Sequence, residues 1–299
     1  MKSANKPMKV AVLGPIAKDY ITIDDREFVH IGSPVYYICT ALKNLGVEEV
    51  DAYANYGKED RDWVEENLKG ISIHHFFAEK TLHGNLGYSS DNPDVRTHTL
   101  FDYNNAIQPT DELLAKLEKF DYIIFGPLLS HHIPFEFYEK LKHKNLVYGN
   151  FGAFAYLEDG KKIYKNPENL IKVLPYINFL YLDNSEAMFV SGKNTVKEAG
   201  KCLIGHGLKN AAITEASKGS HLFIGKDYYK IPAFPPKKII DATGAGDTYL
   251  AAYIRALEIF DNPEQCGRFA AMVASMSLEQ KGAFDGNLDD VMERLRLEK

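Results

Sequence analysis

Hydrophobic positions follow two periods along this chain of 299 residues. Short β-rich runs are apolar at consecutive positions, as expected of strands covered on both faces of a sheet. The predicted strands are Met8–Leu13, Val50–Tyr56, Asp121–Phe125, Asn145–Tyr148, Phe179–Leu182 and Ala211–Thr214. Segments with helical spacing alternate with them: Pro34–Leu45, Thr110–Lys119, Pro134–His143, Ser185–Ser191, Thr195–Gly205, Thr248–Phe260 and Pro263–Glu279. This alternation predicts an α/β fold with a mostly parallel sheet.

Two stretches interrupt the strand–helix alternation. Residues Asp19–Ile31 alternate like a hairpin, and Phe76–Ala106 has no helical face. They could pair into one small sheet, which would form a lid, or remain two separate hairpins, and the pattern favours neither. We expect a single domain over residues 1–299, with a discontinuous β insertion from about 18–32 and 76–106. Asp91–Asp94 predicts a turn in the second insertion.

The composition narrows the classes of function. Lys and Arg total 35 against 41 Asp and Glu, a formal net charge of −6 at pH 7. This balance argues against a binder of nucleic-acid polymers, because nonspecific affinity for phosphate backbones comes from basic patches. The apolar runs are far shorter than the roughly 20 residues of a membrane helix, so we expect no membrane partner.

The cysteines and the first residues indicate a location. Cys39, Cys202 and Cys266 are odd in number and far apart, which indicates neither a disulfide framework nor a zinc site. The first residues, MKSANKPMKVAVLG, lack the apolar core of a secretory signal. We therefore expect the protein to be cytoplasmic.

The strongest chemical signal is the heptapeptide DATGAGD, residues 241–247, directly before a predicted helix. Gly244, Ala245 and Gly246 leave room for a ligand to approach the backbone amides, and a helix N-terminus adds partial positive charge. This pattern predicts an anion hole. Asp247 at its mouth fits a general base that takes a proton from a hydroxyl group attacking phosphorus. The structural alternative is a glycine-rich turn with an aspartate helix cap.

The same heptapeptide resembles the C-terminal signature DTxGAGD of the ribokinase-like (PfkB) carbohydrate kinases. Over about residues 8–290, further segments resemble the family's elements in the family's order. VLGPIAKDY is similar to its first strand and substrate-binding aspartate, and IGSPVYYICTALKNLG to its GGxxxNxAxxLAxLG segment. YGKED, LDNSEAMFVSG and TEASKGS resemble its GxD, NxxE and TxGxxG elements. The resemblance implies a ribokinase-like three-layer sandwich with a mostly parallel central sheet and a small β-sheet lid.

The resemblance also implies an activity and a set of site residues. The implied reaction transfers the γ-phosphoryl group of MgATP to a hydroxyl group of a sugar or sugar derivative. Asp247 would be the base, the amides of Gly244, Ala245 and Gly246 would stabilise the transferring group, and Asp19, with Gly32 and Ser33, would hold the acceptor. The implied ATP-binding residues are Thr214, Ala216, Ser217, Gly219, Gly246 and Ala271. Glu186 and Asp183 would hold Mg²⁺ through water, and Asp241 and Thr243 could bind a monovalent cation such as K⁺.

The departures from the family pattern concentrate at the acceptor pocket. In GGxxxN, Ile31 takes the place of the first glycine and Tyr36 that of the asparagine, while Ala17 replaces an asparagine before Asp19. Tyr36 and its neighbour Tyr37 could offer a flat surface to a sugar or a nucleobase, or belong to a packed helix. Two more substitutions, Asp183 in NxxE and Ala216 in TxGxxG, lie at the metal and ATP elements. An alanine at this position excludes most positive φ values.

Other polar residues received weaker expectations. Arg96 and the pair Asn104-Asn105 in the second insertion are candidates for contact with substrate. The pairs His74-His75 and His131-His132 are not expected to share a metal ion, because adjacent residues on a strand point to opposite faces. Residues 59–66 predict an exposed helix with one buried aromatic residue, Trp63.

The sequence admits three alternatives to a carbohydrate kinase. A nucleoside kinase of the same family and a ligand-binding or regulatory member without catalysis both stay open. A nicotinamide-dependent oxidoreductase is disfavoured, because the turn Gly14–Asp19 lacks the second and third glycines of GxGxxG. The small-molecule acceptor and ATP are the expected partners, and in several relatives the lid doubles as a dimer interface, which makes a homodimer an open expectation.

Overall fold

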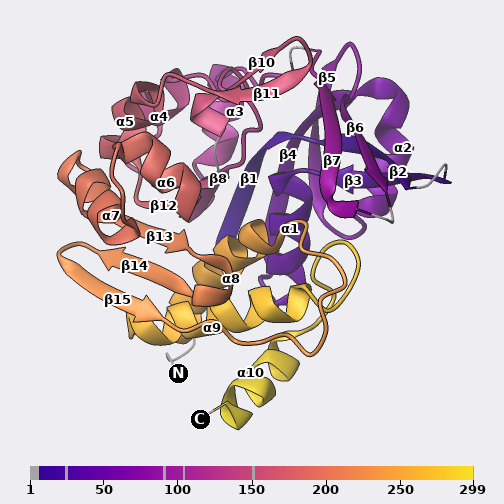
Figure 1. Ribbon diagram of the computed structural model, residues 1–299. Coiled ribbons are helices and arrows are strands. Elements are labelled where there is room, and N and C mark those ends of the chain that lie inside the picture. Colours follow the sequence, from indigo (N-terminus) through magenta and orange to yellow (C-terminus); the bar gives the residue numbers. More distant parts are fainter. Residues whose placement is uncertain (1–6, 24–25, 90–91, 104, 150–151, 299) are drawn as a thin grey trace.

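The computed structural model describes residues 7–23, 26–89, 92–103, 105–149 and 152–298. A nine-stranded sheet forms the centre, with strand order β15-β14-β13-β12-β9-β8-β1-β4-β5 (Figure 1). Its strands are β1 (Lys9–Pro15), β4 (Glu49–Gly57), β5 (Ser72–Ala78), β8 (Tyr122–Phe125), β9 (Asn145–Gly149), β12 (Phe179–Asp183), β13 (Asn210–Thr214), β14 (Ser220–Ile224) and β15 (Asp227–Ile231). Pairing is parallel from β5 to β13 and antiparallel from β13 to β15.

Helices cover both faces of this sheet, because its strands are apolar on both sides. Val10 and Val12 of β1 pack into the core under one helix layer, and Ala11 and Leu13 into the core under the other. The first layer contains α1 (Pro34–Asn44), α2 (Arg61–Asn67), α8 (Ala245–Ile259), α9 (Pro263–Ser277) and α10 (Leu288–Leu297). The second contains α3 (Asp111–Leu117), α4 (Glu136–Lys140), α5 (Glu168–Val173), α6 (Asn184–Ser191) and α7 (Val196–Gly205). The predicted three-layer α/β sandwich is confirmed.

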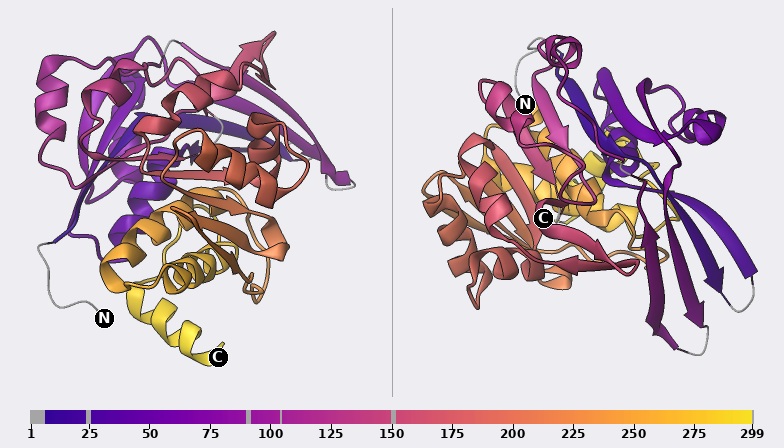
Figure 2. Two further views of the ribbon diagram at one scale, coloured as in Figure 1. Left: turned by 90° about the vertical axis from the view of Figure 1, so that its left-hand side faces the viewer. Right: turned by 90° about the horizontal axis from the view of Figure 1, so that it is seen from above.

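The two β insertions form one separate sheet, with strand order β3-β2-β6-β7. Its strands are β2 (Ala17–Ile23), β3 (Arg26–Gly32), β6 (Leu82–Ser89) and β7 (Asn92–Phe101). Parallel pairing between β2 and β6 joins the insertions, so they are not two separate hairpins. The sheet projects from the body of the molecule (Figure 2). It begins at Leu82 instead of near residue 76, because Phe76–Ala78 completes β5 at the edge of the main sheet.

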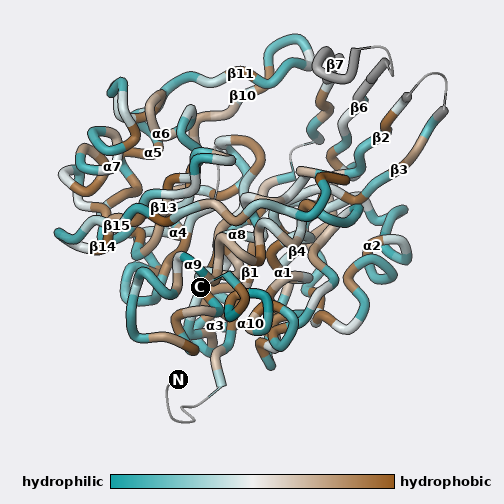
Figure 3. Tube along the Cα trace, turned by 60° about the horizontal axis from the view of Figure 1, so that its bottom comes forward, coloured by the Kyte–Doolittle hydropathy of each residue, from teal (hydrophilic) through white to brown (hydrophobic). Residues whose placement is uncertain are grey.

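Several shorter elements connect these layers. A hairpin of β10 (Ala155–Glu158) and β11 (Lys161–Tyr164) forms a third sheet, and single 3-10 turns are η1 (Lys58–Asp60), η2 (Gly152–Phe154), η3 (Leu174–Tyr176) and η4 (Ala216–Lys218). Hydrophobic segments lie at the centre along β1, β4, α1 and α8, and hydrophilic ones along the peripheral turns (Figure 3). In the described chain, no helix combines the length and the apolar character needed to cross a membrane.

Two boundaries differ from the sequence-based expectations in ways that matter for the site. Helix α8 begins at Ala245, so Gly246 and Asp247 belong to its first turn instead of preceding it. The expected helix near residues 59–66 exists as η1 and α2, but Val64 is its buried residue, while Trp63 is only partly buried.

Candidate active site

The N-terminus of α8 is shaped to receive an anion. Its N-cap is Gly244, whose left-handed backbone (φ 73°) suits glycine and which offers no side-chain cap to the first turn. The ring of Tyr37 packs directly against Gly244 where any side chain would project. On the far side, a Cβ on Gly246 would lie 2.5 Å from the hydroxyl of Tyr181. Glycine is therefore needed at both positions, and the backbone between them lies open to a ligand.

Asp247 is partly buried in the first turn of α8, at this opening. Burial raises the pKa of its carboxyl group to about 7. A carboxylate that titrates near neutrality matches the requirement for a general base, since efficiency is greatest when the pKa lies near the working pH.

Asp19 lies on β2 of the small sheet, beside the point where the chain enters α1. A Cβ on Gly32 would lie 2.5 Å from Oδ2 of Asp19, so this glycine makes room for the carboxylate. Burial raises the pKa of Asp19 to about 6. The pKa of Tyr37 is raised first by burial and then by the negative charges of Asp241, Asp247 and Asp19. The phenol of Tyr37 therefore lies within electrostatic range of both Asp19 and Asp247.

The backbone conformation at the start of α1 indicates that the alignment with the GGxxxN pattern is shifted by one residue from the expected one. Ser33 has φ 121° and ψ 153°, a conformation that is nearly restricted to glycine. The glycine pair of the GGxxxN pattern therefore corresponds to Gly32 and Ser33, and its asparagine to Tyr37. The hydroxyl of Tyr36 lies against the backbone of Ala283 and near Gly282.

The loop before α8 is tied to a second turn by Asp241. Its Oδ1 accepts a hydrogen bond from the amide of Thr243 at 2.9 Å, and its Oδ2 accepts one from the amide of Gly282 at 3.3 Å. The expected cation-binding pair, Asp241 and Thr243, thus lies in one short loop that is braced against residues 282–283.

Asp183 and Glu186 form a capping box at the start of α6. Asp183 Oδ1 accepts from the amide of Glu186 at 2.8 Å, and Glu186 Oε2 accepts from the amide of Asp183 at 2.9 Å. Burial, followed by the neighbouring Asp183, raises the pKa of Glu186 to about 8. Each carboxylate has an oxygen outside the capping box, and Mg²⁺ with its water shell prefers such oxygens. The pair fits a hydrated Mg²⁺ ion, which would compensate their mutual repulsion.

The expected nucleotide-binding residues follow β13. Thr214 donates to or accepts from the Tyr181 hydroxyl at 3.0 Å, which connects this strand end to the N-terminus of α8. Ala216 adopts φ 48°, so an alanine keeps the left-handed conformation of the family's glycine at some cost in strain. Ser217 is exposed, Gly219 is held at φ 87°, and Ala271 is nearly buried in α9, which packs on β14 and β15.

Asn105 is fully buried where the small sheet returns to the body. Its amide donates to Asn55 Oδ1 at 3.0 Å and to the carbonyl of Lys80 at 3.1 Å, and its carbonyl accepts from the amide of Tyr103 at 3.2 Å. The side chain joins β4 to both ends of the β6–β7 insertion. Asn104 and the side chain of Arg96 lie outside the described residues.

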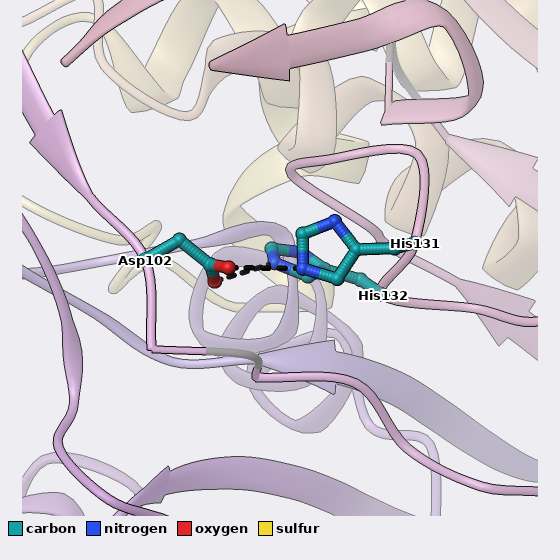
Figure 4. Close-up of side chains that lie close together, drawn as sticks. All are labelled: Asp102, His131 and His132. Atoms are coloured by element: carbon teal, nitrogen blue, oxygen red, sulfur yellow. Dashed lines mark hydrogen bonds and ion pairs between the residues drawn. The ribbon is translucent and has the colours of Figure 1, made fainter. Parts of the chain in front are cut away.

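Asp102 contacts two histidines (Figure 4), and its Oδ1 also accepts a hydrogen bond from the amide of Asn105 at 3.4 Å. Nε2 of His131 lies 2.9 Å from one carboxylate oxygen of Asp102, and Nε2 of His132 lies 3.0 Å from the other. The expectation that His131 and His132 point apart is therefore wrong, because they lie in a turn after β8 and not on a strand. Although burial opposes it, these bonds hold the pKa of Asp102 well below its usual value.

Asp102, His131 and His132 are residue types that bind metal ions, but the hydrogen bonds of His132 indicate that its ring is protonated at the nitrogen a metal ion would need. Nδ1 of the fully buried His132 accepts from the amides of Leu128 and Leu129, at 3.2 and 3.1 Å. The proton of the neutral ring is thereby assigned to Nε2, the atom that a metal ion would need. The cluster fastens β7 to the loop after β8. In contrast, His74 and His75 on β5 do point apart, toward Asp51 and Tyr56 respectively.

Two residues near the candidate site, Tyr181 and Asp102, belong to no sequence motif, and only the structure shows what they contact. Tyr37 was expected only as an alternative to Tyr36. The alignment favours Tyr37, because starting GGxxxNxAxxLAxLG at Gly32 also brings Leu42, Leu45 and Gly46 into register.

Comparison with known proteins gives consistent results. Residues 38–290 match the model of the pfkB family carbohydrate kinases. The chain is 23% identical to a cytidine kinase of Thermococcus kodakarensis over 285 residues, 92% of this chain and 98% of that protein. It is 33% identical to a nucleoside kinase of Methanocaldococcus jannaschii over 132 residues, which is 43% of this chain and only 42% of that relative. The structure of Arabidopsis thaliana ribokinase complexed with ribose and ATP superposes with a TM-score of 0.79 at 19% identity, covering 97% of this chain and 99% of that chain.

Proposed function

Because this chain belongs to the pfkB family of carbohydrate kinases, phosphotransferases that act on a hydroxyl group, we propose that it transfers the γ-phosphoryl group of MgATP to a hydroxyl group of a small sugar-containing acceptor. The observation that carries the proposal is Asp247, a carboxylate with a pKa of about 7 in the uncapped first turn of α8. A non-catalytic ligand-binding protein would have no use for a destabilised carboxylate beside an anion hole.

The proposed reaction begins with orientation of the acceptor. Asp19 accepts hydrogen bonds from acceptor hydroxyl groups, and Gly32 keeps the space beside it open. Ser33 sets the chain direction into α1, and Tyr37, in place of Tyr36, forms the wall between Asp19 and Asp247. Asp247 takes the proton as the acceptor oxygen attacks phosphorus, while the amides of the turn at Gly244, Ala245 and Gly246 hold the charge on the phosphoryl oxygens.

The other proposed roles concern ATP and cations. Thr214, Ala216, Ser217 and Gly219 border the nucleotide together with Ala271. Asp183 and Glu186 hold hydrated Mg²⁺, which neutralises phosphate charge when bound. Asp241 and Thr243 are the proposed ligands of a monovalent cation such as K⁺. Asn105 is proposed as a positioning residue, because both of its amide hydrogens are used within the protein.

The small sheet is proposed to close over the acceptor, since Asp19 lies on it and exclusion of water favours transfer to the acceptor over hydrolysis. A homodimer through this sheet remains a proposal, and so does a cytoplasmic location, which the three free cysteines support.

The test is release of ADP from MgATP by purified protein with a panel of sugars and nucleosides, with and without K⁺. Acceptor-dependent turnover that falls by about 10²-fold or more in Asp247→Asn supports the proposal. Tight binding of an acceptor without turnover would instead favour a non-catalytic member. Equal turnover of a folded Asp247→Asn variant would remove the assigned base.

A further inference from the structure

The face of the small sheet that carries Asp19 continues outward as an apolar surface. Asp19 on β2 is paired with His30 on β3, and Ile21 is paired with Phe28. Paired residues project from the same face, and residues two apart on a strand do so as well. Asp19, His30, Ile21 and Phe28 therefore share one face, which we call the acceptor face.

Contacts near the base of the sheet show that this face is turned toward the body. Ala17, Leu82 and Leu100 lie on it by the same register and pack with Leu129 and Ala155 of the body. Farther out, Gly84 is paired with Asp19, so no side chain stands next to the carboxylate on that side. The base is closed by apolar packing, whereas Asp19 keeps part of its surface exposed.

The outer part of the acceptor face leaves apolar groups accessible. Phe28 is 43% exposed, and Ile21 is partly exposed. They lie one strand repeat beyond Asp19, about 7 Å along the strand. The opposite face of the sheet behaves differently: there the rings of Tyr20, His83 and Phe101 pack on one another.

The described polar groups of this face fit a ligand part that is rich in hydroxyl groups. Asp19 is the one carboxylate among the described side chains of the acceptor face, and His30 is its paired neighbour, whereas Lys18 projects from the other face and pairs with Asp60 at 2.5 Å. A hydroxyl-rich part near Asp19 and an apolar part near Phe28 match the surface.

Resting on the proposed kinase activity, we propose that the acceptor is a glycoside or nucleoside with a planar or apolar group, which packs on Phe28 and Ile21 while its sugar binds Asp19. Free monosaccharides would use only the polar half of the acceptor face. Phe28 is thus a specificity-determining residue, and this inference favours the nucleoside-type acceptor over the simple sugar.

The test compares a free pentose with an uncharged aromatic riboside of the same pentose, using MgATP. We expect kcat/KM to be at least tenfold higher for the riboside, a ratio that falls about tenfold or more in Phe28→Ala. Val29→Ala is the matched control, because Val29 is 48% exposed on the opposite face of the same strand. It should leave the ratio within about twofold of the wild-type value.

A second measurement separates this inference from the proposed activity. Affinity for the riboside, measured calorimetrically with a non-hydrolysable ATP analogue, should fall in Phe28→Ala and not in Val29→Ala, even if no turnover is seen. Preference for the free pentose, or equal effects of both substitutions on riboside affinity, would overturn the inference. So would a change of oligomeric state in Phe28→Ala with an unaltered riboside-to-pentose ratio, which would make Phe28 an interface residue.

Discussion

The pH dependence of the reaction should report the environment of Asp247. A general base must be ionised, and in the free enzyme burial raises the pKa of this carboxyl group to about 7. Since kcat/KM reflects the ionisation of free enzyme, we expect it to rise with pH along a limb whose midpoint lies near pH 7. An ordinary exposed aspartate would instead be fully active above about pH 5.

The expected magnitude follows from the titration. With a pKa of about 7, about one carboxyl group in eleven is ionised at pH 6 and about ten in eleven at pH 8, so kcat/KM should increase about tenfold between these values. The assay is ADP release with the acceptor and MgATP both subsaturating, so that the rate reports the free enzyme. Burial also raises the pKa of Asp19 to about 6 in the native protein. In Asp19→Asn this second titrating group is absent, so the limb near pH 7 should persist at lower overall efficiency.

The raised pKa of Asp247 also predicts how the stability of the folded protein depends on pH. Because the native pKa of Asp247 lies above the unfolded value of about 4, the native state binds more protons between about pH 4 and pH 7, and stability is lost as pH rises through this range. Asp247→Asn should therefore gain thermal stability relative to wild type as pH increases from 4 to 8, while losing activity. A flat kcat/KM between pH 6 and pH 8, together with no such gain, would refute the reasoning.

Three further predictions concern the start of α1, the histidine pair after β8 and the proposed Mg²⁺ site. Ser33→Gly should raise the free energy of unfolding, measured by urea titration, by about 1 kcal/mol. The reason is that the strain energy removed at this position exceeds the entropic cost of ordering a glycine. A loss of stability would show that Ser33 is not strained. His132→Ala should lower the free energy of unfolding by about 2–4 kcal/mol, since two amides and Asp102 lose a buried partner. The control His131→Ala, at an exposed position, should lower it by less than about 1 kcal/mol. Equal losses would contradict the structural role assigned to His132. Glu186→Gln should raise the Mg²⁺ concentration for half-maximal activity by about tenfold. This is the lower end of the effects seen for groups that act on a metal through its other ligands. An unchanged Mg²⁺ titration would show that Glu186 does not belong to the cation site.

The α/β architecture could be predicted because strand and helix periods alternate through most of the chain. The seven-residue motif before α8 similarly predicted a glycine-rich turn that leads into a helix, since glycines at fixed spacing have a direct backbone consequence. Residues Phe76–Ala106 were harder to assign. Their first part continues a strand of the main sheet, and only inter-strand pairing shows where the small sheet starts.

The acceptor pocket was less predictable because its geometry depends on single-residue register. The residue types do not reveal the glycine-like conformation at Ser33, and it is Tyr37, not Tyr36, whose ring lies against Gly244. Adjacent side chains point to opposite faces only on a strand. His131 and His132 lie in a turn, so that expectation failed for them, and the sequence pattern did not show the turn. Their common partner, Asp102, lies about thirty residues earlier in the chain.

The central claim is that Asp19, Asp247 and the first turn of α8 surround one phosphoryl-transfer site. It is tested most directly by a crystal structure with a non-hydrolysable ATP analogue, Mg²⁺ and the acceptor that gives the highest turnover. The account predicts an acceptor hydroxyl within hydrogen-bond distance of Asp247, a second acceptor hydroxyl on Asp19, and the terminal phosphate at the amides that follow Gly244. An acceptor bound away from Asp19, or a terminal phosphate held elsewhere than at α8, would contradict it.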